Sequence, residues 1–171
     1  AIKYSLSGAS IPPDAKTFLT QARQQGFKPK VITLGKALLF PSTIEALGDL
    51  GLGLTTEVWW SPSHPFTSSL TKQSAKALAD SYEAGTKKQW TQPIGFAHAL
   101  FEVASNALSR SKSLKPADVR DAVAATSINS VVGPVKWGGQ GPMKNVSKTP
   151  LVLGQWVKGQ QRKVDLVIVN N

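Results

Sequence analysis

The sequence contains no cysteine and only two histidines among its 171 residues. Without cysteine there is no thiol nucleophile, no disulfide and no thiolate metal site. Two histidines, His64 and His98, are too few for a metal cluster, so no metal and no other cofactor is predicted. The chain also lacks a GxSxG nucleophile elbow, and the Ser7–Ser10 stretch is more typical of a plain turn. We therefore do not expect an enzyme.

Long apolar runs and acidic residues are both scarce. No apolar run approaches the length of a membrane span, and the amino end shows no basic-then-apolar signal segment. Ten Asp plus Glu against 20 Lys plus Arg give a formal charge of +10. The basic residues are spread along the chain in short pairs such as Lys87-Lys88, which favours a generally basic surface. A basic nucleic-acid-binding module remains as a weaker alternative.

The first part of the chain alternates apolar β-branched runs with amphipathic stretches. The order strand, helix, strand, helix, strand predicts parallel strands joined by right-handed crossovers. Since parallel strands end at one edge of a sheet, Lys36 and Ala37 are expected to share an edge with Trp59 and Trp60. The expected elements are strands at 2–6, 31–34 and 52–58, a loop at 7–13, and helices that begin at Asp14 and Pro41.

The character of the sequence changes after Trp60. Two prolines within residues 61–65 predict a crossover without regular structure, in which His64 is either a surface residue or a pocket-rim residue. A core role is expected for His98, inside a long helix that we expect to be buried on more than one side. Helices are expected at 69–84, 93–111 and 116–126, then strands at 131–137, 151–157 and 164–169, with a turn at 138–142.

Five ordered phrases of the sequence resemble the carboxyl-terminal part of type I periplasmic solute-binding proteins, the branched-chain amino acid and amide group of ABC importers. They are FLTQARQQGFK at 18–28, EALGDLGLGL at 45–54, PIGFAHALFEVASNAL at 93–108, PADVRDAVAAT at 116–126 and VVGPVKW at 131–137. The resemblance implies an α/β fold, a partial two-lobed type I periplasmic binding fold with parallel Rossmann-like sheets and hinge crossovers. The WWSPSHP exit and the AHALF stretch depart from the commonest forms.

The resemblance also implies a domain organisation. It assigns 1–57 to the second half of the carboxyl-terminal lobe, 58–66 to a hinge crossover, 67–130 to the last helices of the amino-terminal lobe, and 131–171 to a crossover and closing strands. The complete family fold is much longer, so we expect a mature or truncated product with an unfinished sheet edge and bare helix faces. Such a chain is expected to persist with the missing amino-terminal part or with a second copy.

By resemblance, the protein is a periplasmic, exported bacterial component of an ABC importer that binds a small solute between two lobes and delivers it to a membrane permease. A ligand-sensing receptor domain of the same fold is the alternative. Amino-acid binders of this family carry an acid after the strand at 31–34, where this chain has Lys36. This lysine argues against an ordinary α-amino acid and favours an aromatic or short-chain organic acid. The predicted solute is thus a small organic acid or an amino-acid-like molecule. The predicted ligand-binding residues are Ser10, Lys36, Ala37, Trp60, His64, Gln92 and Phe96.

Overall fold

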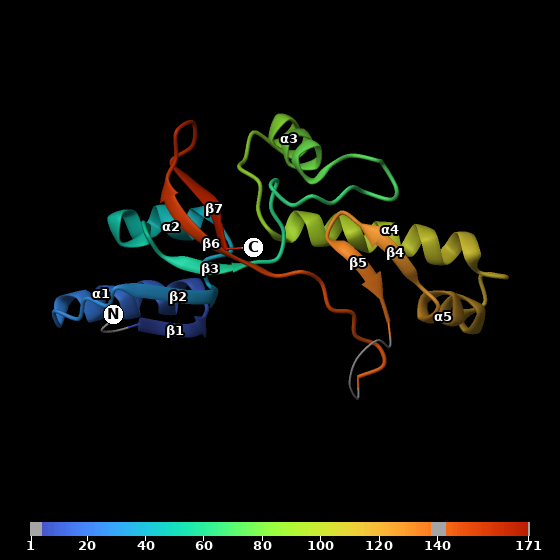
Figure 1. Ribbon diagram of the computed structural model, residues 1–171, viewed down its shortest axis with the longest axis horizontal. Coiled ribbons are helices and arrows are strands. Elements are labelled where there is room, and N and C mark those ends of the chain that lie inside the picture. Colours follow the sequence, from blue (N-terminus) through green and yellow to red (C-terminus); the bar gives the residue numbers. More distant parts are fainter. Residues whose placement is uncertain (1–4, 138–142, 171) are drawn as a thin grey trace. The chain divides into compact units, whose positions relative to one another are not determined.

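The protein is described by a computed structural model that covers residues 5–137 and 143–170. The chain divides into two compact units. Unit 1 comprises residues 1–58 and 151–171, and unit 2 comprises residues 59–150. The predicted α/β class with a parallel sheet is confirmed, since unit 1 contains three neighbouring parallel strands. Figure 1 shows the elements of both units.

Unit 1 is built on a five-stranded mixed sheet. Strands β1 and β2 pair in parallel, β2 pairs with β3 in parallel, and the hairpin β6–β7 is added antiparallel beside β3 (Figure 1). The strand order is β1-β2-β3-β6-β7. The strands are β1 (Ser5–Ser10), β2 (Val31–Lys36), β3 (Thr55–Val58), β6 (Val152–Lys158) and β7 (Val164–Asn170).

Two helical segments connect the parallel strands. Helix α1 (Pro12–Gln24) joins β1 to β2, whereas α2 (Pro41–Leu47) and the 3-10 turn η1 (Gly48–Gly51) join β2 to β3. Both helices begin with proline, whose fixed φ suits a first helical turn. The core of the unit gathers Leu38, Ile44, Val58 and Trp156, all almost fully buried. Trp156 also donates its indole N–H to the carbonyl of Leu38 over 2.9 Å, which ties β6 to the loop after β2.

The start of the chain differs from the sequence prediction. A loop was expected at 7–13, yet β1 continues to Ser10 and the helix begins at Pro12. The parallel ladder explains the difference, because β1 pairs with β2 in register from Ser5↔Val31 to Ser10↔Lys36. Serine and glycine have little intrinsic preference for strands, but pairing with a neighbouring strand can hold them in one. The first part of the strand expected at 2–6 lies outside the described residues.

Unit 2 holds three helices and a short hairpin. They are α3 (Ala75–Thr86), α4 (Pro93–Arg110), α5 (Pro116–Ala124), β4 (Ser127–Ser130) and β5 (Gly133–Lys136). Strands β4 and β5 are antiparallel, so the single strand expected at 131–137 is one arm of a hairpin that turns at Val131 and Val132. The turn expected at 138–142 lies outside the described residues. None of the described helices combines the length and the apolar character needed to cross a bilayer.

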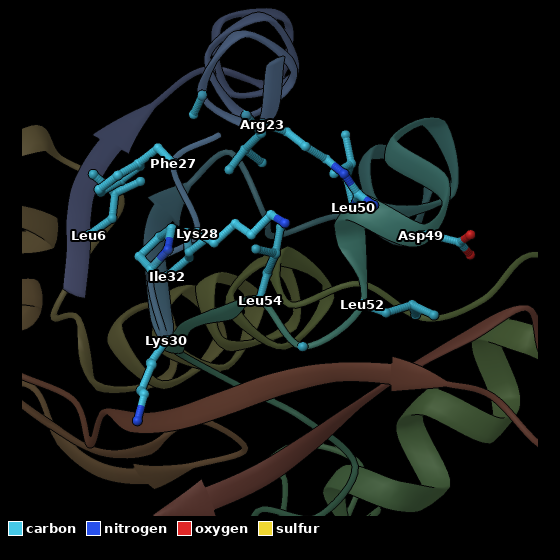
Figure 2. Close-up of a pocket in the computed structure, with 14 residues that line it drawn as sticks. Leu6, Arg23, Phe27, Lys28, Lys30, Ile32, Asp49, Leu50, Leu52 and Leu54 are labelled. Atoms are coloured by element: carbon cyan, nitrogen blue, oxygen red, sulfur yellow. The ribbon is translucent and has the colours of Figure 1, made fainter. Parts of the chain in front are cut away.

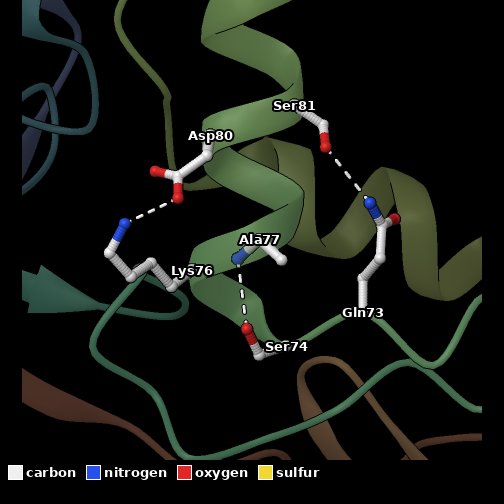
Figure 3. Close-up of polar contacts among 6 residues, drawn as sticks. All are labelled: Gln73, Ser74, Lys76, Ala77, Asp80 and Ser81. Carbon is white, nitrogen blue, oxygen red and sulfur yellow. Dashed lines mark hydrogen bonds and ion pairs between the residues drawn. The ribbon is translucent and has the colours of Figure 1, made fainter.

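Helix α3 begins later than the sequence suggested. The predicted start was residue 69, but Ser74 caps the helix by accepting the Ala77 N–H over 3.1 Å. Figure 3 shows this cap together with the Gln73–Ser81 hydrogen bond and the Lys76–Asp80 ion pair. An N-cap serine satisfies a backbone donor that the first helical turn leaves open. The stretch just before Ser74 is therefore a loop rather than a first helical turn.

Helix α4 does not have the predicted burial. Its inward residues are mostly small, Gly95, Ala99 and Ala107, together with Glu102. The bulky side chains of Leu100, Phe101 and Leu108 are 67%, 66% and 50% exposed. The prediction that this helix is buried on more than one side is therefore wrong for this chain. The expectation of bare apolar helix faces is confirmed.

Candidate functional site

The carboxyl edge of the unit 1 sheet brings together three of the predicted residues. Ser10 is paired with Lys36 in the ladder, and Ala37 follows directly. Lys36 has a φ of 60°, which is uncommon for a residue with a side chain, and its side chain is exposed. Ala37 is fully buried and donates its N–H to the Gly35 carbonyl over 2.6 Å. The chain thus turns sharply after β2 and leaves the lysine at the rim.

Glu57 is a fourth member of this edge, and sequence reasoning missed it. Its Oε1 accepts the Lys36 N–H over 2.8 Å, and its Oε2 accepts the Thr56 hydroxyl over 3.2 Å. The carboxylate lies over Gly35, where a Cβ would be only 2.8 Å from Oε2. The signal for Glu57 is that it lies opposite a glycine, Gly35, on the neighbouring strand. This signal can be recognised only when the register of the two strands is known.

Ser10 offers a hydroxyl at the same edge. Within the described part of the chain its Oγ is buried and has no hydrogen-bond partner. A buried hydroxyl without a partner costs about 1–3 kcal/mol. Below the edge, the hydroxyls of Thr33 and Thr55 lie 2.5 Å apart and join β2 to β3. The edge combines a cation, an anion and a hydroxyl on a braced sheet.

Trp60 is packed inside unit 2, contrary to the prediction that it lines a pocket. It is fully buried, and its ring meets Trp90 edge to face at 6.0 Å between centroids. Gly95 supplies the space on the other side, since a Cβ there would lie 2.3 Å from Cγ of Trp60. This burial gives Trp60 a packing role, because no surface is left for a ligand to touch.

Trp59 and Phe96 form the partly exposed aromatic pair of unit 2. Their rings meet edge to face with centroids 6.1 Å apart. The predicted residue Gln92 is fully buried, and its Oε1 accepts the Trp59 N–H over 2.7 Å. Gln92 therefore fixes the backbone of Trp59, and the aromatic surface belongs to Trp59 and Phe96.

His64 is a packed residue of the loop that follows Trp60. Its Nδ1 accepts the Ser61 N–H over 3.0 Å and lies 2.9 Å from the Ser61 hydroxyl. Burial lowers the pKa of His64 below its ordinary value, and the hydrogen bond with Ser61 opposes that shift only in part. The neutral ring stabilises the loop at 61–64. Neither of the two roles expected for His64, on the surface or at a pocket rim, fits its burial.

A second network in unit 2 also escaped sequence reasoning. The buried carboxylate of Glu102 accepts the N–H and the hydroxyl of Ser69 over 2.5 and 2.8 Å, and the Val131 N–H over 3.0 Å. Half-buried His98 lies one turn earlier, and its Nε2 is 2.7 Å from the Ser68 hydroxyl. The hydrogen bond expected of His98 is present, but its side chain is half-buried and does not lie in the core as predicted. In the described ranges, no group of three or more His, Cys, Asp or Glu side chains is placed to hold a metal.

Solved structures that match the chain share its fold. A leucine binding protein from Thermotoga maritima matches with a TM-score of 0.74 at 19% identity, over 97% of this chain and 44% of that one. A branched-chain amino acid substrate binding protein from Streptococcus pneumoniae, solved with isoleucine, gives 0.68 at 14%, over 98% and 44%. A solute binding protein from R. palustris, solved with benzoate, gives 0.66 at 17%, over 97% and 42%.

The chain thus spans less than half the length of these structures. A search of curated proteins gave no match. A family model described as periplasmic binding protein matches residues 3–161, which is nearly the whole chain. Together with the parallel sheet of unit 1 and the fold shared with these structures, this match shows that the chain belongs to the periplasmic binding protein family.

Proposed function

We propose that the complete protein is the periplasmic solute-binding component of an ABC importer, and that it binds a small solute carrying a carboxylate. The observation behind the proposal is the exposed Lys36 side chain at the carboxyl edge of the sheet, in register with the Ser10 hydroxyl. A lysine and a hydroxyl are both donors that favour an anionic oxygen. Two of the similar structures were solved with isoleucine and with benzoate, and both molecules carry a carboxylate.

Glu57 favours a second version of this function, in which the solute is amino-acid-like. Its carboxylate is held by the Lys36 N–H and by Thr56, which fixes a negative charge at the same edge as the lysine. A zwitterion can satisfy both charges, whereas a simple organic acid satisfies only the lysine. The ligand's amino group is thus the feature that separates the two solute classes.

The aromatic pair of Trp59 and Phe96 is a further proposed contact surface in the complete protein. Edge-to-face rings that remain partly exposed suit the flat apolar body of an aromatic acid. This pair takes the place that the sequence analysis gave to Trp60 and Phe96. Gln92 is then a supporting residue that holds Trp59 in position. A sensory role for the same binding fold remains the alternative to transport.

The proposed binding partners of the protein itself are a permease and the amino-terminal part found in the longer relatives. Leu100, Phe101 and Leu108 present an apolar face on α4, and within the described ranges β1 pairs with β2 alone. Bare apolar faces and open strand edges both favour association. We expect sedimentation of the 171-residue chain to show a complex, either with that amino-terminal part or with a second copy. A well-folded monomer would contradict this.

The test of the proposed function is direct identification of the solute. The complete protein is purified without added ligand, denatured, and the released small molecules are analysed by mass spectrometry. Calorimetry then compares benzoate, isoleucine and isoleucine amide, which differ in the carboxylate and the amino group. The proposal requires that benzoate or isoleucine binds and that isoleucine amide does not. Binding of isoleucine alone would favour the amino-acid-like solute, and binding of benzoate alone would favour the organic acid. Recovery of a bound sugar or a cation would overturn it, and chemical conversion of the solute would indicate an enzyme.

A further inference from the structure

A cavity of about 550 Å³ lies in unit 1 at the amino ends of β2 and β3, away from the Lys36 edge. Its floor is a row of apolar side chains on neighbouring strands, since Leu6 is paired with Ile32 and Leu54 precedes the Thr33↔Thr55 pair. Leu19 of α1 and Leu50 of η1 form the walls. Apolar pockets of this size are typical of small-molecule sites.

The charges around this cavity are almost all positive. Figure 2 shows the Arg23 and Lys28 side chains reaching toward the middle of the cavity, whereas Lys30 and the carboxylate of Asp49 point away from it. Among the described residues, no ion pair joins Arg23 or Lys28 to an acid. Two cations thus converge over an apolar floor without a protein carboxylate to neutralise them.

The apolar lining is not closed by the unit itself. Ile32 and Leu6 of the floor remain partly exposed, and Phe27 and Leu52 at the margin are 40% and 37% exposed. Apolar surface left open beside unpaired cations suits a molecule with an apolar body and one acidic head. A neutral apolar molecule would leave both cations without a counter-charge, and a cationic one would be repelled by them.

We propose that this cavity is a second binding site, specific for a small amphiphilic acid with one carboxylate on an alkyl chain. The carboxylate binds Arg23 and Lys28, and the chain lies against Leu6, Ile32 and Leu54. Arginine suits this role because its planar guanidinium can hold a carboxylate through two parallel hydrogen bonds. The site is independent of the solute site at Lys36, because the two lie at opposite ends of the parallel strands.

The test uses octanoate as the probe and the matched molecules octan-1-ol and octylammonium as controls. Calorimetry on the protein should show octanoate binding at least tenfold tighter than octan-1-ol, with no measurable binding of octylammonium. Methyl NMR should show shifts at Ile32 and Leu54 on addition of octanoate. Equal affinity for octanoate and octan-1-ol, or shifts confined to other methyl groups, would overturn the proposal.

Variants of the protein locate the interaction. The double variant Arg23→Gln, Lys28→Gln should weaken octanoate binding tenfold or more and leave octan-1-ol unaffected. Lys16→Gln is the matched control, since Lys16 is an exposed cation of α1 that does not line the cavity. Ala22→Phe, which fills the cavity from α1, should abolish binding of both molecules. In Lys36→Met, methyl shifts at Ile32 and Leu54 that persist on addition of octanoate would place it in the cavity, and loss of these shifts would instead place octanoate at the solute site.

Discussion

Unit 1 buries several leucine and isoleucine side chains, whereas the described part of unit 2 buries alanine, valine and two tryptophans. In unit 1, Leu38, Ile44 and Trp156 are almost fully buried around the sheet. In unit 2, α4 turns small residues inward and exposes Leu100 and Phe101. Hydrophobic stabilisation is proportional to the apolar area that is buried. We therefore expect burial of apolar side chains to contribute more to the stability of unit 1 than to that of unit 2. Unit 1 depends on a core, and unit 2 depends more on buried polar networks and tight ring packing.

The largest expected effect tests the core of unit 1 against the bare face of unit 2. Trp156→Ala should reduce the free energy of unfolding by about 3–5 kcal/mol, because it empties a large buried volume. It also removes the indole hydrogen bond to Leu38. Phe101→Ala, at a ring that is 66% exposed, should change it by less than about 0.5 kcal/mol. Denaturant unfolding of both variants measures the contrast, and similar losses would contradict it.

The next effect concerns the polar network of unit 2. Glu102→Ala should reduce the free energy of unfolding by about 3 kcal/mol, because it leaves the buried amide of Val131 and the Ser69 amide without their acceptor. Glu102→Gln is the matched control. Glutamine keeps one of the two acceptor oxygens, so this variant should lose less stability than Glu102→Ala. Thermal unfolding followed by circular dichroism gives both values. Equal stability of Glu102→Ala and the parent protein would show that unit 2 does not depend on this network.

The third effect is on binding rather than on folding. Lys36→Met in the complete protein should weaken binding of a carboxylate-bearing solute by about 1.5–3 kcal/mol, since a hydrogen bond from a charged donor is lost. Lys16→Met removes the same charge from an exposed position of α1 and serves as the control. Calorimetry measures both, and an unchanged affinity of Lys36→Met would refute the role of Lys36.

The fold was more accessible from the sequence than the site. Apolar periodicity and β-branched runs predicted the alternation of strands and helices in unit 1, because those patterns depend on local burial. The length of β1 was not predictable in this way, since Ser7, Gly8 and Ser10 join the strand only through their pairing with β2. Tertiary pairing overrides local propensity at such positions.

The candidate site residues also differ in how far the sequence indicates them, because some depend on local pattern and others on tertiary contacts. Lys36 was proposed because the ends of parallel strands converge on one edge, and its role in binding stays a prediction. Ser10 had been placed in a loop, and it reaches the same edge only through its pairing with β2. Glu57 and Glu102 were missed, since a single acid in a strand or helix is usually exposed. The choice between Trp59 and Trp60 depended on Gly95, which is distant in sequence and leaves space for only one of the two rings. The sequence placed both tryptophans at one edge, and only the packing in the structure shows that Trp60 is the buried one.

The smallest expected effect is a pH dependence that originates in unit 2. Burial lowers the pKa of His64 in the folded protein below the ordinary value of 6.5. As the pH falls below that value, the unfolded chain binds a proton that the folded protein does not, so stability falls with it. Above the ordinary value, His64 is neutral in both states and contributes no pH dependence.

The measurement is the free energy of unfolding between about pH 5 and pH 8, with His64→Gln as the matched variant. The parent protein should lose stability toward pH 5, and the variant should lose less of it, because glutamine keeps a side-chain acceptor near Ser61 but cannot take up a proton. Parallel curves would show that carboxylates of either unit, rather than His64, cause the loss. Since His64 lies in unit 2, a slope that disappears in this variant would also show that unit 2 unfolds in the same transition that is being measured.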